Sequence, residues 1–353
     1  MIVPAALHCG PRRLPLAADP PGDVEDARSL LCASGCQVPV VRGVPRFVSP
    51  GHYAGGFGLQ WNAYRRTQRD SHTGATISWD RLTRCLGGDL GVVRDRDVLE
   101  VGCGAGRFTE VLLASGARLV ACDLSEAVEA NRANCARLAE PGRYFVCQAD
   151  VADLPVAPGS FDLVIALGMV QHTPSPERTI ETLAAQLKPG GLLVLDHYTW
   201  PPGAGALFRL ASALSPRSLI RHALRPLPAR AAFAACTALT RALLPVHRLF
   251  WRRGTAARAA RRGLHLASPI FDYYDKLPQL SREQLTEWAL LDTHDGLTDR
   301  FKHRRSGEEI ASALTAAGLV ELDVQYAGNG VEARARRGPT STAPSVDLPL
   351  AKS

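Results

Sequence analysis

The chain has 353 residues, of which 46% are hydrophobic and 21% are charged, and its formal net charge at pH 7 is +7. This length allows one large domain with additions, or two domains, around a sizeable core. The N-terminal residues contain no continuous apolar segment after a basic start, and no run of about 18 apolar residues occurs in the chain. Secretion and a membrane span are therefore not expected, and we expect a cytoplasmic protein.

Residues 1–48 carry three of the nine cysteines, Cys9, Cys32 and Cys36. An odd number of cysteines over a long chain argues against a secreted disulfide scaffold, so we expect reduced and mostly buried thiols. Cys32 and Cys36 form a C-x3-C pair, but Arg12 stands where a second cysteine beside Cys9 would complete a zinc site. His8 is a poor replacement, because adjacent residues rarely bind one tetrahedral ion together, and we expect no metal.

Residues 49–96 are expected to form helices ahead of the first strand of a sheet. In residues 97–200, apolar runs alternate with amphipathic stretches, which predicts strands at 97–102, 118–124, 143–150, 160–168 and 190–199. Helices are predicted at 107–116, after Ser125, and from Pro176 to a stop at Pro189 and Gly190. This alternation implies βαβ units and a parallel sheet covered by helices on both faces.

Residues 201–280 are rich in alanine, leucine and arginine and are interrupted by prolines, which indicates several short helices inserted after the fifth strand. From His197 to Phe271 there are twelve arginines and no lysine, aspartate or glutamate, so this segment carries +12 and the rest of the chain −5. The helix and strand rhythm resumes in residues 281–337. Ser306 and Glu309 form a predicted capping box, and a tight turn joins strands at 320–326 and 330–337. The tail, residues 338–353, is expected to be disordered.

Three glycines, Gly102, Gly104 and Gly106, follow the first predicted strand. Residues without a side chain allow the backbone to approach a ligand closely. A dinucleotide-binding fingerprint, G-x-G-x-x-G, would need a third glycine at position 107, where the chain has Arg107. A dinucleotide is therefore disfavoured.

Acidic residues accompany these glycines at the ends of predicted strands. Glu100 precedes the glycines, Asp123 ends the second strand, and Asp150 ends the third strand and is followed by Val151. A carboxylate at the tip of the second strand can accept both hydrogens of a ribose diol. Asp150 and Val151 stand where an adenine amine and ring could be met.

On the motif LEVGCGAG and the later stretches PGSFDLVIALGMVQHTPSP and LKPGGLLVLDHYT, residues 97–200 resemble the class I S-adenosylmethionine-dependent methyltransferases. The resemblance implies an α/β fold with a Rossmann-like, seven-stranded, mostly parallel sheet, a helical cap insert and a short N-terminal segment. It implies S-adenosylmethionine as cofactor, with the glycines against the methionine part, Asp123 at the ribose and Asp150 at the adenine. The cofactor-binding residues expected from it are Glu100, Gly102, Gly104, Gly106, Asp123, Leu124, Asp150 and Val151.

Two segments outside this core also resemble parts of bacterial members of the family. Residues 1–48 resemble a zinc-ribbon-like segment, here interpreted as a degenerate, metal-free remnant. The phrases FG-x-QW and TQ-x-D resemble lid helices, which implies that Phe57, Gln60 and Trp61 close over the cofactor and exclude water. The alternative is that these side chains only fix the helix to the sheet.

A hydroxyl or carbon acceptor needs its proton removed before methyl transfer, whereas a carboxylate does not. His172 follows the fourth strand, and His197 and Tyr198 end the fifth, at the edge where open α/β sheets bind substrates. These three are the candidate bases, with a packing role as the alternative for each. His294 is a further candidate, because the flanking Asp292 and Asp295 could raise its pKa and orient it, but an exposed acidic loop is the favoured alternative.

The sequence therefore predicts a methyltransferase that acts on a hydroxyl, carboxyl or carbon of a small molecule in a biosynthetic pathway, with the basic insert as a cap over the acceptor. An anionic, lipid-linked or glycan acceptor at a membrane surface remains an alternative, as does a non-catalytic cofactor-binding partner protein. An NAD(P)-linked oxidoreductase is weakened by Arg107 and Glu100. A nucleic-acid amine is disfavoured, because GMVQHTP replaces the Asn/Asp-Pro-Pro-aromatic motif typical of such enzymes.

Overall fold

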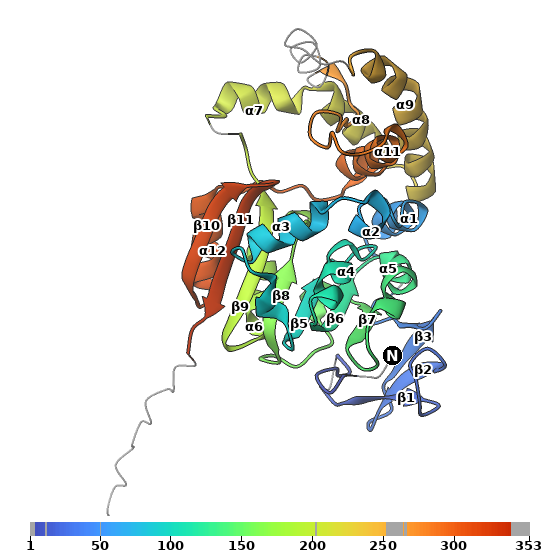
Figure 1. Ribbon diagram of the computed structural model, residues 1–353, viewed down its shortest axis with the longest axis vertical. Coiled ribbons are helices and arrows are strands. Elements are labelled where there is room, and N and C mark those ends of the chain that lie inside the picture. Colours follow the sequence, from blue (N-terminus) through green and yellow to red (C-terminus); the bar gives the residue numbers. More distant parts are fainter. Residues whose placement is uncertain are drawn as a thin grey trace, which may run out of the picture.

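The computed structural model describes residues 4–10, 13–49, 51–201, 203–251, 264 and 267–339. A central sheet carries helices on both faces, a smaller sheet lies at the N-terminal end, and a group of helices covers one end of the central sheet (Figure 1). The predicted disordered tail falls, from residue 340 on, outside the described residues.

The central sheet has seven strands in the order β10-β11-β9-β8-β5-β6-β7. Strands β9, β8, β5, β6 and β7 run parallel, whereas β11 is antiparallel to β9 and β10 is antiparallel to β11. This confirms the predicted Rossmann-like, mostly parallel sheet. The strands are β5 (Asp97–Val101), β6 (Arg118–Asp123), β7 (Tyr144–Gln148), β8 (Phe161–Ala166), β9 (Leu187–Tyr198), β10 (Leu319–Ala327) and β11 (Gly330–Arg337).

Alternate residues of the buried strands supply the cores on the two faces of the sheet. In β5, Val98 packs into one apolar cluster and Leu99 into another, as the two-residue period of a strand requires. Helices α3 (Ile77–Cys85), α4 (Arg107–Ala114) and α5 (Ala127–Cys135) contribute to the first cluster, and α6 (Pro176–Ala185) and α12 (Gly307–Ala316) to the second. Short 3-10 turns occupy Leu90–Val93, Ala136–Leu138, Val151–Asp153 and Val170–His172.

Helix α6 is shorter than the sequence pattern indicates. It ends at Ala185, and β9 already begins at Leu187, whose backbone is in register with Phe161 of β8 and whose side chain is buried. Pro189 and Gly190 therefore lie within the irregular start of a strand. Pairing with β8, which the local sequence does not reveal, decides this boundary.

The N-terminal segment folds as a four-stranded antiparallel sheet of β1 (Leu16–Asp19), β2 (Ser29–Cys32), β3 (Gln37–Val41) and β4 (Val44–Pro45). Leu7 and Leu30 from this segment are fully buried in the same apolar cluster as Phe145 of β7. The small sheet thus shares a hydrophobic core with one face of the large one.

A group of helices lies beyond the carboxyl ends of the parallel strands (Figure 1). The group consists of α1 (Gly55–Ala63), α2 (Asp70–Thr73), α7 (Ala206–Ala213), α8 (Pro216–Leu224), α9 (Ala229–Leu249) and α11 (Arg282–Thr298). Helix α9 packs along α11 and α1, and α8 packs on α11. The prolines of the insert predicted only short helices, yet α9 is 21 residues long and continues past Pro245. Burial of Leu244 and His247 on either side of Pro245 compensates for the backbone hydrogen bond that a proline cannot donate. Among the described residues, no helix is long and apolar enough to cross a membrane.

Candidate active site

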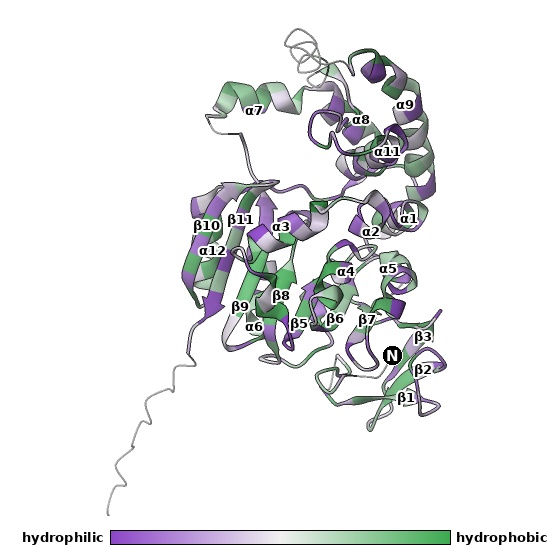
Figure 2. Cartoon of the chain, in the orientation of Figure 1, coloured by the Kyte–Doolittle hydropathy of each residue, from purple (hydrophilic) through white to green (hydrophobic). Residues whose placement is uncertain are grey.

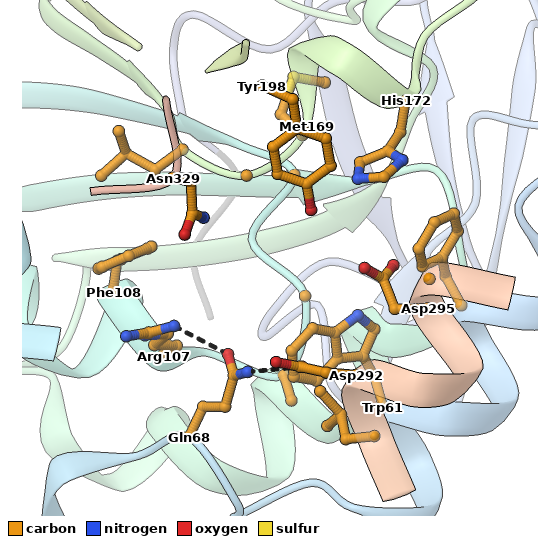
Figure 3. A pocket seen from close by; sticks show the side chains of 18 of the residues that line it. Trp61, Gln68, Arg107, Phe108, Met169, His172, Tyr198, Asp292, Asp295 and Asn329 are labelled. Carbon is orange, nitrogen blue, oxygen red and sulfur yellow. Dashed lines mark hydrogen bonds between the residues drawn. The ribbon is translucent and has the colours of Figure 1, made fainter. Parts of the chain in front are cut away.

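A cavity of about 960 Å³ opens at the carboxyl ends of the parallel strands. Each of the five strands contributes to its wall through a residue at or just after its end, namely Gly102, Asp123, Asp150, Met169 and Tyr198. Helices α1 and α11 form the opposite side, and side chains from both sides point into the space between them (Figure 3). The cavity therefore lies where the sheet reverses its strand order, which is the usual ligand site of such sheets.

The glycine loop leaves no room for side chains. Gly102 and Gly106 have φ values of 75° and 95°, and a Cβ atom would lie 2.5 Å from Met169 Cβ at the first position and 2.6 Å from Cys135 Sγ at the second. Gly102 and Gly104 line the cavity, whereas Gly106 precedes α4 and packs against α5. Two of the three predicted glycines thus face the cavity, and the third allows the close helix contact.

Asp123 is held rigidly at the tip of β6. Its Oδ2 accepts a hydrogen bond from the Gly104 amide at 3.0 Å, and its Oδ1 accepts from the Ser125 amide and hydroxyl at 2.8 and 2.7 Å. Burial raises the pKa of Asp123, and these hydrogen bonds oppose that rise. Leu124, Asp150 and Val151 line the cavity beside it, and Asp150 also accepts a hydrogen bond from the Ala152 amide at 2.9 Å.

Glu100 does not reach the cavity. Its side chain is buried behind the glycine loop, where Oε2 accepts a hydrogen bond from the Thr109 hydroxyl at 2.6 Å. Burial raises the pKa of Glu100 to about 8. In place of the predicted direct contact with a cofactor, Glu100 holds Thr109 of α4.

The predicted lid helix, α1, brings Phe57 and Trp61 to the cavity wall but not Gln60. Trp61 packs over the glycine loop, 3.5 Å from where a Cβ of Gly104 would stand. Gln60 points the other way, is fully buried and hydrogen-bonds His294 Nδ1 through its Oε1. Gln60 therefore joins α1 to α11, which contradicts its predicted place over the cofactor.

His172 and Tyr198 line the cavity, whereas His197 does not. Alternate side chains of a strand point to opposite faces, so His197 turns into the protein, with Nδ1 2.8 Å from the Tyr198 carbonyl oxygen. The ring centroids of His172 and Tyr198 are 5.4 Å apart, edge to face. Of the three predicted bases, the structure brings these two together and leaves His197 out.

His172 is held by a carboxylate as well as by a carbonyl. Its Nδ1 lies 3.2 Å from the Phe301 carbonyl oxygen and 3.3 Å from Asp299 Oδ2. Burial lowers the pKa of His172, but Asp299 and Asp295 outweigh it, so its pKa is raised overall. Arg221 of α8 donates to Asp299 Oδ1 at 2.7 Å and fixes that carboxylate.

Sequence reasoning identified the wrong group in the segment around His294. His294 lies buried in α11 and not in an exposed loop, with its ring against Gln60, and burial lowers its pKa to about 4 instead of raising it. Asp292 and Asp295 line the cavity instead. The sequence could have indicated this arrangement, because a spacing of three residues places the side chains of Asp292 and Asp295 on one face of a helix.

A second polar group that sequence reasoning missed surrounds Arg107. Its Nη1 donates to Gln68 Oε1 at 3.0 Å, and Gln68 Nε2 donates to Asp292 Oδ1 at 3.2 Å (Figure 3). The Tyr273 hydroxyl donates to the other oxygen of Asp292. Burial raises the pKa of Asp292 to about 7 and lowers that of Arg107 to about 10. Arg107, which in the sequence argues only against a dinucleotide, lines the cavity.

The thiols of Cys9, Cys32 and Cys36 converge, with Sγ atoms within 4.8 Å of one another. A hydrogen bond with the Ser34 hydroxyl lowers the pKa of Cys32 to about 6. Three thiolates can fill three of the four positions of a tetrahedral zinc site. Sequence spacing did not reveal this convergence, and the expectation of a metal-free segment stays a prediction.

The cavity fits the predicted cofactor. The left-handed backbone at Gly102 and Gly104 lines the cavity without a side chain, and Asp123 offers fixed carboxylate oxygens to a diol. Trp61, Phe57 and Leu124 supply apolar surface around them. A nucleoside with an amino-acid side arm is the class of ligand that such a mixture suits.

Residues 99–195 match the family model described as "Methyltransferase domain". A ubiquinone biosynthesis O-methyltransferase of Xanthomonas campestris pv. campestris is 39% identical over 112 residues, which are 31% of this chain and 46% of the relative. A protein of the same name from Coxiella burnetii is 34% identical over 101 residues, 29% of this chain and 43% of the relative. The chain therefore spans less than half the length of these curated relatives.

Among solved structures, the magnesium protoporphyrin IX methyltransferase of Synechocystis PCC 6803 with bound SAH is 16% identical, with a TM-score of 0.43, over 81% of this chain and 97% of the other. The matched residues 99–195 include the glycine loop and Asp123. The chain therefore carries a class I S-adenosylmethionine-dependent methyltransferase domain, built around residues 99–195, and S-adenosylmethionine is the cofactor of that domain.

Proposed function

We propose that the protein transfers the methyl group of S-adenosylmethionine to a hydroxyl, carboxyl or carbon atom of a small-molecule acceptor in a biosynthetic pathway. The observation that carries the proposal is one continuous cavity, which runs from the glycine loop and Asp123 to His172, Tyr198 and Asp295. A hydroxyl is the first candidate, because the Xanthomonas and Coxiella relatives are named O-methyltransferases.

The sulfonium of S-adenosylmethionine supplies an already activated methyl group, so the protein mainly aligns the acceptor with it. In the proposed reaction His172 removes the proton of an acceptor hydroxyl as the oxygen attacks. The Phe301 carbonyl can only accept a hydrogen bond, so Nδ1 of a neutral His172 carries the proton and Nε2 is left to act as the base. Phe57 and Trp61 cover the reacting atoms and exclude water.

Calorimetric titration tests the cofactor part of the proposal, with S-adenosylhomocysteine compared against NADH. We expect binding of the first and none of the second. Preference for NADH would support the oxidoreductase and overturn the proposal.

A radiolabel assay with S-adenosylmethionine and a panel of phenolic, carboxylic and carbon acceptors tests the transfer. We expect turnover of at least one hydroxyl acceptor. Cofactor binding with no turnover on any acceptor would favour the non-catalytic partner protein instead.

An anionic acceptor is a second candidate within the same activity, and a specific observation favours it. Arg217, Lys276, Lys302 and Arg304 line the part of the cavity next to the insert. Such cationic groups attract carboxylates and phosphates. Acceptor pairs that differ only in one carboxylate or phosphate, including lipid-linked ones, would test this through the ratio of their kcat/KM values.

A further inference from the structure

Most of the large apolar side chains that the described residues expose lie in the insert. Eight of fourteen fall between residues 207 and 249. Five of these lie on or beside α7 and α8 and are named here the α7–α8 apolar surface: Leu207, Phe208, Leu210, Leu214 and Leu219. Helices α7 and α8 are in contact, and exposed apolar side chains gathered on neighbouring helices mark a site of contact with another surface.

Helix α7 shows this exposure of apolar side chains most clearly. Its sequence is ALFRLASA, yet none of its residues is buried, and Leu207 is 81% exposed. Helix α7 stands away from the body of the protein, and much of it has the green of apolar residues (Figures 1 and 2). A helix that is apolar on most sides is normally covered, so we expect another surface to bind over α7.

The segment that carries this surface has charges of one sign. Residues 203–251 of the described chain contain seven arginines and no lysine, aspartate or glutamate. Arg225, Arg230 and Arg241 are exposed. Arginine combined with exposed leucine and phenylalanine is the composition of helices that lie in the interface of an anionic membrane.

A second copy of the chain is a poorer occupant. A two-fold dimer brings the same patch of both copies together. Residues 203–251 of both copies would then approach each other, and neither segment has a carboxylate to pair with the arginines of the other. Anionic lipid phosphates supply the negative charge that residues 203–251 lack.

We propose that the α7–α8 apolar surface docks on an anionic phospholipid bilayer. The leucine and phenylalanine side chains enter the boundary between headgroups and acyl chains, and the exposed arginines bind the lipid phosphates. The proposal concerns where the protein works and does not depend on methyl transfer.

Flotation of the full chain with vesicles tests the proposal. We use vesicles of phosphatidylglycerol and phosphatidylcholine, vesicles of phosphatidylcholine alone, and low and high salt. The expected result is flotation with the anionic vesicles, weakened by salt, and little or none with the neutral ones. Absence of flotation with anionic vesicles at low salt would overturn the proposal.

Two double variants separate docking from unspecific attraction. Leu207→Ser/Leu210→Ser should lower the vesicle partition coefficient by roughly tenfold or more, because the lost apolar burial drives insertion. Val320→Ser is the matched control, since Val320 is 44% exposed on β10, outside the insert. Arg225→Gln/Arg230→Gln should lower binding and reduce its salt dependence, whereas Arg137→Gln, an exposed arginine elsewhere, should not.

Two further outcomes contradict the proposal. Unchanged flotation of the Leu207→Ser/Leu210→Ser variant would mean that the apolar surface does not enter the bilayer. A dimer without vesicles that this variant abolishes would identify a second copy as the occupant. Far-ultraviolet circular dichroism and S-adenosylhomocysteine binding, measured on every variant, establish folding and keep failure of docking distinct from failure of the proposed activity.

Discussion

Asp123 combines fixed geometry with a charge that faces the cavity. Three hydrogen bonds from Gly104 and Ser125 hold its two oxygens at the tip of β6. These donors leave the carboxylate little freedom, so its orientation is set before a ligand arrives. A ribose diol would meet a charged acceptor without first ordering the side chain.

Asp123→Ala should weaken S-adenosylhomocysteine binding by roughly 1 to 3 kcal/mol, because charged hydrogen bonds to the ligand are lost. Calorimetric titration measures this directly. Glu181→Ala, on the exposed side of α6, serves as the control and should leave affinity unchanged. Equal affinity of the Asp123 variant and the parent chain would argue against this carboxylate as a ligand.

His172 should make the rate depend on pH in a defined direction. A base must be neutral, and Asp299 and Asp295 raise the pKa of His172 above its usual 6.5 despite its burial. Activity on a hydroxyl acceptor is therefore expected to fall as pH drops through this raised pKa. Removal of the Asp299 charge lowers that pKa and should move the acidic limb of the profile to lower pH.

The measurement is kcat/KM against pH for the parent chain, Asp299→Asn and His172→Gln. The His172 variant should lose the acidic limb together with most of the rate, about 100-fold or more. An unchanged limb in both variants would assign the titration to another group.

At the scale of secondary structure, the turn between β5 and α4 determines whether the cavity exists. Gly102 adopts a left-handed conformation directly against the side chain of Met169. The loop can pass under a ligand only because no side chain occupies that space. A change at this position therefore acts on the turn and on the cavity together.

Gly102→Ala is expected to cost roughly 1 to 3 kcal/mol of stability and to reduce S-adenosylhomocysteine affinity, because the new methyl group combines backbone strain with a clash. Urea unfolding and calorimetry measure the two effects. Gly74 has a similar φ of 70°, and nothing lies within 4 Å of the Cβ that Gly74→Ala adds, so this variant measures the cost of backbone strain alone. Equal losses in both variants would show that the Met169 contact contributes nothing.

The contact between α1 and α11 should make folding sensitive to acid. Burial lowers the pKa of His294 to about 4, whereas its usual value is 6.5. Between these values the unfolded chain binds a proton that the folded chain does not, so stability falls as pH decreases through this window. The expected cost at pH 5 relative to pH 7.5 is about 2 kcal/mol.

Urea unfolding at the two pH values measures this cost, and His294→Gln removes the titrating group while it retains a polar side chain. The difference in stability between pH 7.5 and pH 5 should be about 2 kcal/mol smaller in the variant. The comparison between chains cancels the contribution of Asp292, whose raised pKa acts in the opposite direction. Equal pH dependence in both chains would rule out His294 as the cause.

At the scale of the whole molecule, the N-terminal sheet and the central sheet behave as one packed unit. Leu30 of β2 is fully buried in the apolar cluster that also holds Phe145 of β7. Shared cores of this kind unfold together.

Leu30→Ala should therefore destabilise the entire protein by about 2 to 5 kcal/mol in a single transition, through the cavity that it leaves. Chemical unfolding followed by both fluorescence and circular dichroism would measure it. Leu138→Ala, at a position 49% exposed, is the control and should cost far less. A separate early transition for the N-terminal segment would show that the two sheets fold independently.

The sequence by itself determined the parallel α/β sheet, the glycine loop and the strand-end carboxylates, because each depends on local periodicity, on strand ends or on a backbone conformation that favours glycine. Tertiary structure decided which partners the site side chains meet. Asp299 lies 127 residues after His172 and Gln60 lies 234 residues before His294, so only packing of distant segments could bring Asp299 to His172 and turn Gln60 away from the cavity. The convergence of Cys9 with Cys32 and Cys36, and the exposure of α7, likewise arise from contacts made or missing across the fold, which composition and spacing do not encode.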